Sequence, residues 1–169
     1  MAITLEQLLS SREDRWNHQM ELLSSHPGLT LVCLTVIMPG DVKRNHQSLA
    51  VAHAAVEALR KAFSDEIEES DLETGYEAYL LTPTPQLEAK RMVCDIEEEH
   101  PLGRLFDLDV ITSEGIPLPR SAINRPPRQC LLCQQEARFC MRNHTHTREE
   151  LQQRIDEMVT EFMREKKIR

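Results

Sequence analysis

The sequence predicts an α+β fold in which helices alternate with the strands of a mixed β-sheet, with one hairpin and a helix at each end of the chain. Three features predict it: a nearly continuous apolar run at 29–38, several segments with helical spacing of apolar residues, and the alternating segment "LFDLDVI" at 105–111. A length of 169 residues suits a single domain. We expect one domain over 1–169, with a Cys/His-rich segment at 128–146.

The first half of the chain predicts helix, strand and helix in turn. Residues 4–25 read as a helix that Thr4 and Gln7 open with a capping box. The run "LTLVCLTVIM" at 29–38 is typical of a buried central strand, and it stops at Pro39-Gly40. A second helix is expected over 46–63.

The second half predicts two more strands, a hairpin and two more helices. The segment 76–82 reads as a strand, and Thr84 caps a helix that runs to Glu99. The aspartate-bearing strand follows, and "SEGI" predicts a hairpin that returns a short strand over 116–122. Thr147 then opens the last helix.

Charge is distributed unevenly along the chain. The net charge is −8, but residues 1–100 hold 8 basic and 18 acidic residues, whereas 101–169 hold 12 and 10. The basic excess lies in five arginines, namely Arg120, Arg125, Arg128, Arg138 and Arg142. They suit either forked hydrogen bonding to phosphate or carboxylate, or a solvated surface. An acidic chain with only 4% aromatic residues is not expected to bind nucleic acid, which disfavours an RNA-binding domain.

The chain shows neither a signal peptide nor an apolar run that approaches the length of a membrane span. We therefore expect a cytoplasmic protein without a membrane partner. Its five cysteines would be kept reduced there, so a cluster of cysteines indicates metal binding or catalysis rather than disulfides.

Asp107 and Asp109 lie two residues apart on the predicted strand, so both carboxylates fall on one face. With Cβ atoms roughly 7 Å apart, they could bracket Mg²⁺ together with substrate phosphate oxygens. The alternative is an exposed face with two solvated acids. Gly103 could let the backbone approach a ligand, and Arg104 could hold a phosphate.

The segment "CLLCQQEARFCMRNHTH" supplies metal ligands within seventeen residues. Cys130 and Cys133 form a C-x2-C knuckle, and Cys140 follows with two histidines close behind. This set can close a tetrahedral Zn²⁺ site. Two alternatives stay open: small buried cysteines on a helix, and one reactive thiol whose pKa the arginines lower.

A further candidate phosphate site lies at "MPGDVK", where a glycine turn and Lys43 precede a helix. It lacks the full P-loop pattern, so a plain turn is the alternative. Arg12 shares one face of the first helix with Arg15 and Gln19, and we count it with Lys43 among the candidate phosphate-binding residues.

The stretch "HPLGRLFDLDV", followed by "RPPRQCLLCQQEARFC" and a close histidine, resembles the citrate lyase holo-[acyl-carrier protein] synthase family, also called apo-citrate lyase phosphoribosyl-dephospho-CoA transferase. "LLSSREDRWNHQ" and "LTVIMPGDVK" are also similar, so the resemblance spans roughly residues 5 to 150. Carried over by position, the motif residues are Gly103, Arg104, Asp107, Asp109, Arg128, Cys130, Cys133, Cys140, Arg142 and His146.

The resemblance implies a nucleotidyltransferase. It would move the phosphoribosyl-dephospho-CoA arm of 2'-(5''-triphosphoribosyl)-3'-dephospho-CoA to a serine of the citrate lyase acyl carrier subunit and release diphosphate. On this reading Asp107, Asp109 and Arg104 are catalytic and the aspartates hold Mg²⁺. Phosphate would be bound by residues drawn from Arg12, Lys43, Gly103, Arg120, Arg128 and Arg142. Zn²⁺ would be held by Cys130, Cys133, Cys140 and His146. The alternatives are a zinc-dependent interaction module and the equivalent transferase for the malonate decarboxylase carrier.

Overall fold

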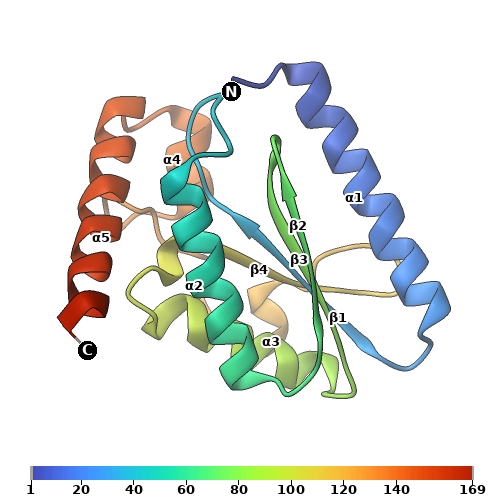
Figure 1. The fold of residues 1–169 in the computed structure, drawn as a ribbon. Coiled ribbons are helices and arrows are strands. Elements are labelled where there is room, and N and C mark those ends of the chain that lie inside the picture. The colour runs from blue at the N-terminus through green and yellow to red at the C-terminus, as the bar shows by residue number, and fades with distance from the viewer. Residues whose placement is uncertain (1, 169) are drawn as a thin grey trace.

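The computed structural model describes residues 2–168 and has an α+β architecture (Figure 1). The long helices are α1 (Leu5–Ser25), α2 (His46–Ala62), α3 (Gln86–Glu99) and α5 (Arg148–Ile168), and α4 (Ala137–Asn143) is short. The strands are β1 (Thr30–Val36), β2 (Ile67–Leu72), β3 (Gly75–Thr82) and β4 (Phe106–Ile111). Two 3₁₀ turns, η1 (Gly103–Leu105) and η2 (Arg120–Ile123), precede β4 and follow it.

The four strands form one sheet in the order β2-β3-β1-β4, and every neighbouring pair is antiparallel. The expectation of a mixed sheet is therefore wrong. The difference is due to β2, a strand that the sequence did not predict because "IEESDL" carries three acids and only two apolar residues. Without β2, the path from β1 through a helix to the next strand looks like a parallel crossover. With β2 in place, a hairpin reverses the chain and β3 runs antiparallel to β1.

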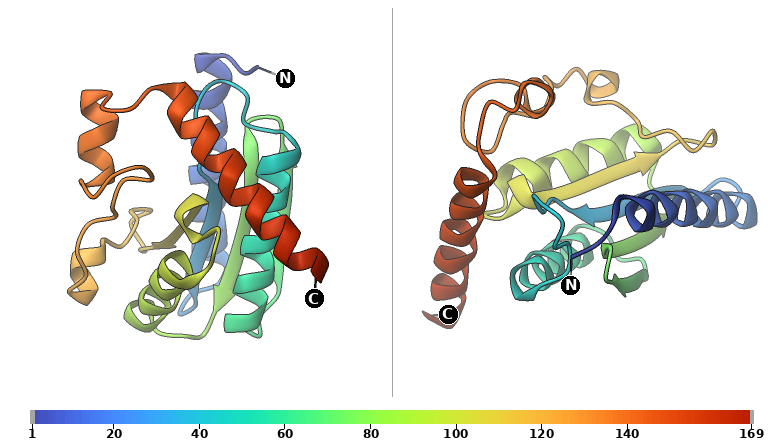
Figure 2. Two further views of the ribbon diagram at one scale, coloured as in Figure 1. Left: turned by 90° about the vertical axis from the view of Figure 1, so that its left-hand side faces the viewer. Right: turned by 90° about the horizontal axis from the view of Figure 1, so that it is seen from above.

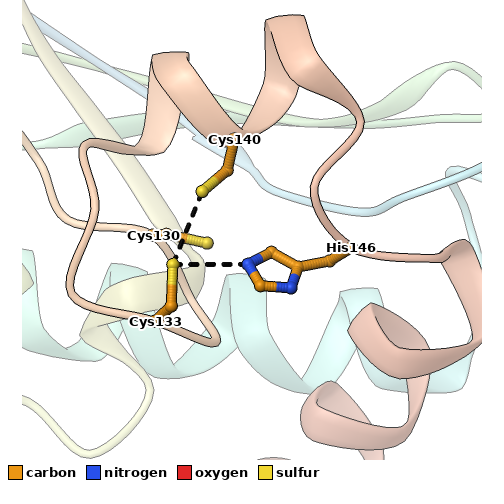
Figure 3. Close-up of side chains that lie close together, drawn as sticks. All are labelled: Cys130, Cys133, Cys140 and His146. Carbon is orange, nitrogen blue, oxygen red and sulfur yellow. Dashed lines mark hydrogen bonds between the residues drawn. The ribbon is translucent and has the colours of Figure 1, made fainter.

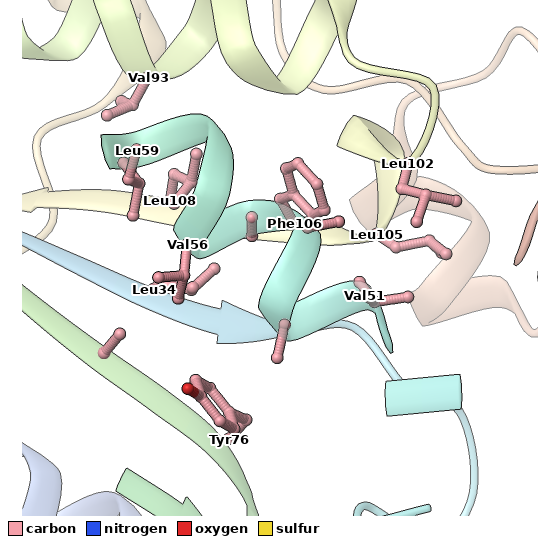
Figure 4. Packing of buried hydrophobic residues seen from close by; sticks show 14 of the residues in the cluster. Leu34, Val51, Val56, Leu59, Tyr76, Val93, Leu102, Leu105, Phe106 and Leu108 are labelled. Atoms are coloured by element: carbon pink, nitrogen blue, oxygen red, sulfur yellow. The ribbon is translucent and has the colours of Figure 1, made fainter. Parts of the chain in front are cut away.

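Each face of the sheet is covered differently. Val32 and Leu34 on β1 and Leu108 on β4 belong to the main core, which α2, α3 and α5 complete. The opposite face carries a small cluster that includes Leu31 and Tyr79, against which α1 packs through its last turns. Figure 1 shows α1 on one side of the strands and α2 and α5 on the other, and Figure 4 shows part of the main core, where Val56 and Leu59 of α2 lie among its side chains.

The predicted strand over 116–122 is absent from the described structure. The chain does turn at Gly115, whose φ is +74°, but pairing is limited to an isolated bridge between Ile111 and Pro117. Pro117 and Pro119, both within the predicted strand, have no amide donor, so a ladder cannot extend. The chain instead enters η2, and the hairpin of this fold is β2–β3.

The predicted helix starts are confirmed at both ends of the chain. Thr4 and Gln7 form the expected capping box on α1, and Thr147 and Glu150 exchange the same pair of bonds at α5. Within residues 2–168, no helix combines the length and the hydropathy that crossing a membrane requires.

Candidate active site

The strand register places polar residues side by side on the sheet face that α1 crosses. Asp107 lies opposite Thr35, which lies opposite Glu77, and Asp109 lies opposite Cys33. Directly opposed residues of antiparallel strands share a face, so the two aspartates lie on the same face, as the sequence predicted. Thr35 Oγ1 donates a hydrogen bond to Asp107 Oδ2 at 3.3 Å. The row as a whole is a polar strip on a sheet whose other face is apolar.

The two aspartates differ in environment. The Asp107 side chain is 48% exposed, whereas Asp109 lies deeper, opposite Cys33 of β1. Burial, followed by the charge of Asp107, raises the pKa of Asp109 to about 6. Removing a carboxylate from water destabilises its charged form, and a second negative charge nearby adds to that cost. The pair is therefore an incompletely neutralised negative site that a cation would stabilise.

The edge of β4 is closed by a buried carboxylate on α3. Glu97 is only 5% exposed, and its Oε1 accepts a hydrogen bond from the Leu108 amide at 3.0 Å. It also pairs with Arg120 at 2.5 Å and with Arg128 at 2.9 Å. Glu97 thus caps an open edge of the sheet and holds both guanidinium groups.

Of the candidate phosphate-binding arginines, Arg128 lies nearest to the aspartates. One of its nitrogens donates to the Phe106 carbonyl, and another lies 3.9 Å from Asp107. Arg120 is bound to Glu97 and to Glu98, so both of its terminal nitrogens, Nη1 and Nη2, already have carboxylate partners. Arg128 is therefore the guanidinium that can act beside the aspartate pair.

Arg104 and Gly103 have different environments from those expected. The Arg104 guanidinium donates to the carbonyls of Gln129 and Cys130, so it ties the start of β4 to the cysteine segment. Gly103 packs against the end of α3, where an added Cβ would lie 2.4 Å from the Glu97 carbonyl oxygen and 2.6 Å from that of Ile96. The glycine thus permits close packing of backbone on backbone.

A group of three cations lies beyond the end of β1. Lys43 Nζ donates to the Met38 carbonyl at 2.5 Å. Burial, then the neighbouring charges of Arg12 and Arg148, lower the pKa of Lys43. The sequence pointed to Lys43 and Arg12, but it missed Arg148, which α5 contributes from more than a hundred residues away. Asp41 lies 3.8 Å from Arg148 and offsets part of this charge, and the remaining positive charge favours binding of an anion.

The α1 helix completes the polar face on its β3 side. Arg15 pairs with buried Glu77 at 3.0 Å, and the Tyr79 hydroxyl donates to the same carboxylate at 2.5 Å. A cleft of about 550 Å³ lies between α1 and the β2–β3 hairpin. Its lining includes Asp14, Glu68 and Glu77, so this side of α1 disfavours phosphate groups.

The four predicted zinc ligands come together. The ligand atoms of Cys130, Cys133, Cys140 and His146 all lie within 4.8 Å of one another, and Figure 3 shows them converging from the loop, from α4 and from the segment before α5. Cys133 Sγ is 3.5 Å from Cys140 Sγ and 3.4 Å from His146 Nε2. With bonds of about 2.3 Å to sulfur, tetrahedral ligands lie roughly 3.5–4 Å apart, so the arrangement fits zinc.

The backbone also supports a thiolate in this cluster. Burial by itself would raise the pKa of Cys130, but the amides of Leu132 and Cys133 and the neighbouring thiols lower it to about 7. Amide groups that point at a sulfur stabilise its charged form, which is the form that binds metal. The alternative in which the cysteines lie together on one helix is wrong, because Cys130 and Cys133 lie in the loop and only Cys140 lies on α4.

Comparison with known proteins identifies the family. Residues 3–162 match the family described as apo-citrate lyase phosphoribosyl-dephospho-CoA transferase. A protein of Escherichia coli O1:K1 with that name is 35% identical over 166 residues, which cover 95% of this chain and 90% of the relative. The chain belongs to the apo-citrate lyase phosphoribosyl-dephospho-CoA transferase family.

Two further relatives extend the comparison. A Streptococcus pyogenes serotype M18 protein, named as a probable apo-citrate lyase phosphoribosyl-dephospho-CoA transferase, is 36% identical over 168 residues, which cover 95% of this chain and 88% of the relative. The Haemophilus influenzae protein named CitXG is 36% identical over 163 residues, which cover 93% of this chain but 35% of that longer protein. In this family the transferase chain thus occurs alone and as part of a larger polypeptide.

Sequence reasoning missed several residues that shape this candidate site. Glu97 is one of three consecutive glutamates on α3, and no local pattern distinguishes the one that faces β4. Glu77 and Arg15 belong to separate elements that meet only through the strand register and the packing of α1. The one usable signal for Glu97 was the apolar stripe of α3. Glu97 directly follows Ile96 and therefore lies at the border of that stripe.

Proposed function

We propose that this chain transfers the phosphoribosyl-dephospho-CoA group from 2'-(5''-triphosphoribosyl)-3'-dephospho-CoA to a serine of the citrate lyase acyl carrier subunit, with release of diphosphate. The observation that carries the proposal is the aspartate pair on an open polar strand face beside Arg128, in a chain matched to this family over residues 3–162. The named relatives act on citrate lyase, which favours that carrier over the malonate decarboxylase carrier.

The proposed reaction is a nucleotidyl transfer. The serine Oγ forms a bond to the α-phosphorus as the bond to the diphosphate oxygen breaks, and one of the two aspartates accepts the serine proton. Charge grows on the phosphate oxygens and on the leaving group, so positioning and electrostatic stabilisation decide the rate. Asp107 and Asp109 offer the hard oxygen ligands that suit Mg²⁺, which would neutralise that charge when bound.

The basic residues of the chain lie where the phosphate groups and the leaving diphosphate would carry negative charge. Arg128, 3.9 Å from Asp107, would donate hydrogen bonds to the oxygens of the α-phosphate that is attacked. Arg12, Lys43 and Arg148 lie past the end of β1, the strand that pairs with the aspartate-bearing strand β4. Their positive charge would bind the β- and γ-phosphates and then the leaving diphosphate.

We further propose that Cys130, Cys133, Cys140 and His146 hold a structural zinc ion. Four protein ligands leave no open position, which is typical of structural rather than catalytic zinc. Arg104 links this segment to the start of β4 through two carbonyls, so the ion would fix the loop that carries Arg128. A zinc-dependent interaction module would use the same cluster, but it would give no reason for the aspartate pair.

The test is release of diphosphate and modification of the carrier, measured with the wild-type chain, with Asp107→Asn and with a carrier whose acceptor serine is alanine. We expect release of diphosphate only when the wild-type chain is combined with the carrier that keeps its acceptor serine. Release that persists with Asp107→Asn at the wild-type rate would contradict the role of the aspartates, and release without the serine would contradict the transfer.

A further inference from the structure

Helix α4 carries an exposed face of mixed cationic and apolar character. At 100° per residue, Arg138 and Arg142 lie on the side of the helix opposite Cys140, with Met141 and Phe139 on either flank. Both arginines are exposed, and Met141 and Phe139 are exposed by 73% and 51%. Exposed arginine, phenylalanine and methionine side by side are typical of protein interfaces.

The structure divides the arginine-rich segment into two functional groups. Arg120, Arg125 and Arg128 all pair with acids, from Asp95, Glu97 and Glu98 on α3 to Asp107 on β4. In the described part of the chain, the guanidinium groups of Arg138 and Arg142 form no ion pair. Three arginines therefore serve the fold and the active site, and two remain for a partner.

The α4 helix is placed next to the aspartate end of β4. The Ala137 amide donates to the Arg128 carbonyl at 2.8 Å, and the Arg128 guanidinium contacts the Phe106 carbonyl and lies 3.9 Å from Asp107. Figure 2 shows α4 at the periphery of the molecule, and Figure 3 shows Cys140 turned inward from it. A partner seated on the outer face of α4 would thus lie beside the candidate active site.

We propose that Arg138, Phe139, Met141 and Arg142 form the docking surface for the protein substrate, and that they receive an acidic surface with exposed apolar side chains next to its acceptor serine. The inference rests on the proposed function, which requires a protein acceptor. The whole chain carries a net charge of −8, so an acidic partner is repelled by most of the surface. The α4 face differs from most of the surface because it presents two arginines without an ion pair beside exposed apolar side chains, and such a local charge steers and orients an encounter.

Docking on α4 also connects to the Cys/His cluster. Cys140 belongs to α4, and its thiol lies 3.5 Å from that of Cys133 in the preceding loop. The helix has only seven residues, which is too short to be stable by itself. Its position therefore depends on the cluster, and disrupting the cluster is expected to weaken binding of the acceptor as well as to lower stability.

The test compares two double charge reversals. Arg138→Glu with Arg142→Glu removes the docking charges, and Arg164→Glu with Lys167→Glu makes the same change of net charge on exposed residues near the end of α5, away from α4 (Figure 1). The steady-state rate of transfer is measured first at varied concentrations of the carrier and then at varied concentrations of the triphosphate donor. The melting temperature of each variant is measured as well. We expect the α4 variant to raise the KM for carrier by about ten-fold or more, with the KM for donor and the melting temperature near wild type.

Three outcomes would overturn the docking surface: an unchanged KM for carrier, an equal rise in the α5 control, or a rise confined to the KM for donor, which would make Arg142 a phosphate ligand. Direct binding of the unmodified carrier, followed by fluorescence anisotropy, separates this proposal from the proposed function. Loss of binding in the α4 variant alone supports docking even if wild type transfers nothing. Phe139→Ser provides a second variant, expected to weaken carrier binding without any change of charge.

Discussion

The buried carboxylate of Asp109 should lower the stability of the folded protein, and Asp109→Asn tests this. Burial and Asp107 raise its pKa from 3.8 to about 6, so between these values the folded state binds a proton that the unfolded state has lost. Stability is therefore highest below pH 3.8 with respect to this group, and it falls as the pH rises through 6. A ten-fold change in proton affinity corresponds to about 1.4 kcal/mol. The shift of Asp109 therefore lowers the free energy of unfolding at high pH by at most about 3 kcal/mol.

The assay is urea unfolding of wild type and Asp109→Asn at pH 5 and at pH 8, without added divalent ions. At pH 8 we expect the variant to be more stable by about 1–3 kcal/mol, which for a chain of this size is a rise in melting temperature of roughly 3–9 °C. The gain should shrink at pH 5. Asp107→Asn, at a half-exposed position, should give a smaller gain. An Asp109→Asn protein that is no more stable than wild type at pH 8 would refute the reasoning.

Four further changes test other parts of the account. Gly103→Ala places a Cβ 2.4 Å from the Glu97 carbonyl oxygen, so it should destabilise the fold by about 1–3 kcal/mol in urea unfolding; an unchanged midpoint would contradict the packing role. Glu97→Ala should cost about 3–5 kcal/mol because two guanidinium groups lose their shared buried carboxylate, and a loss below about 1 kcal/mol would argue against it. Cys133→Ser should reduce metal content, measured by elemental analysis, and lower the melting temperature; a protein purified without zinc and unaffected by the substitution would exclude the structural ion. Arg148→Ala should raise the KM for the triphosphate donor about ten-fold while the KM for carrier stays constant, and equal values for variant and wild type would remove Arg148 from the diphosphate site.

The elements that follow local rules could be predicted from the sequence. The strand 106–111 and the faces of its two aspartates follow from a period of two, and the capping box at Thr4 follows from a four-residue pattern. The cysteine cluster was also accessible, because its ligands are close in sequence and their spacing is typical of metal sites.

The parts that depend on distant packing could not be predicted. The strand β2 lies at the edge of the sheet with mostly exposed side chains, so burial leaves little apolar signal in "IEESDL". Because β2 was missed, β3 was expected to follow α2 directly, which gave a parallel crossover in place of the antiparallel pairing of β1 with β3. The apolar stripe of α3 places Glu97 at its border, but the partners of Glu97 and the site of Arg148 depend on how whole helices pack against distant parts of the chain.

The central claim is that this chain modifies a carrier serine through the aspartate face of β4. The most direct measurement is the intact mass of the citrate lyase acyl carrier subunit after incubation with the protein, the triphosphoribosyl-dephospho-CoA donor and Mg²⁺, with Asp107→Asn in parallel. The account predicts a mass gain equal to the phosphoribosyl-dephospho-CoA arm with wild type and none with the variant. An unmodified carrier with wild type, or equal modification by the variant, would contradict it.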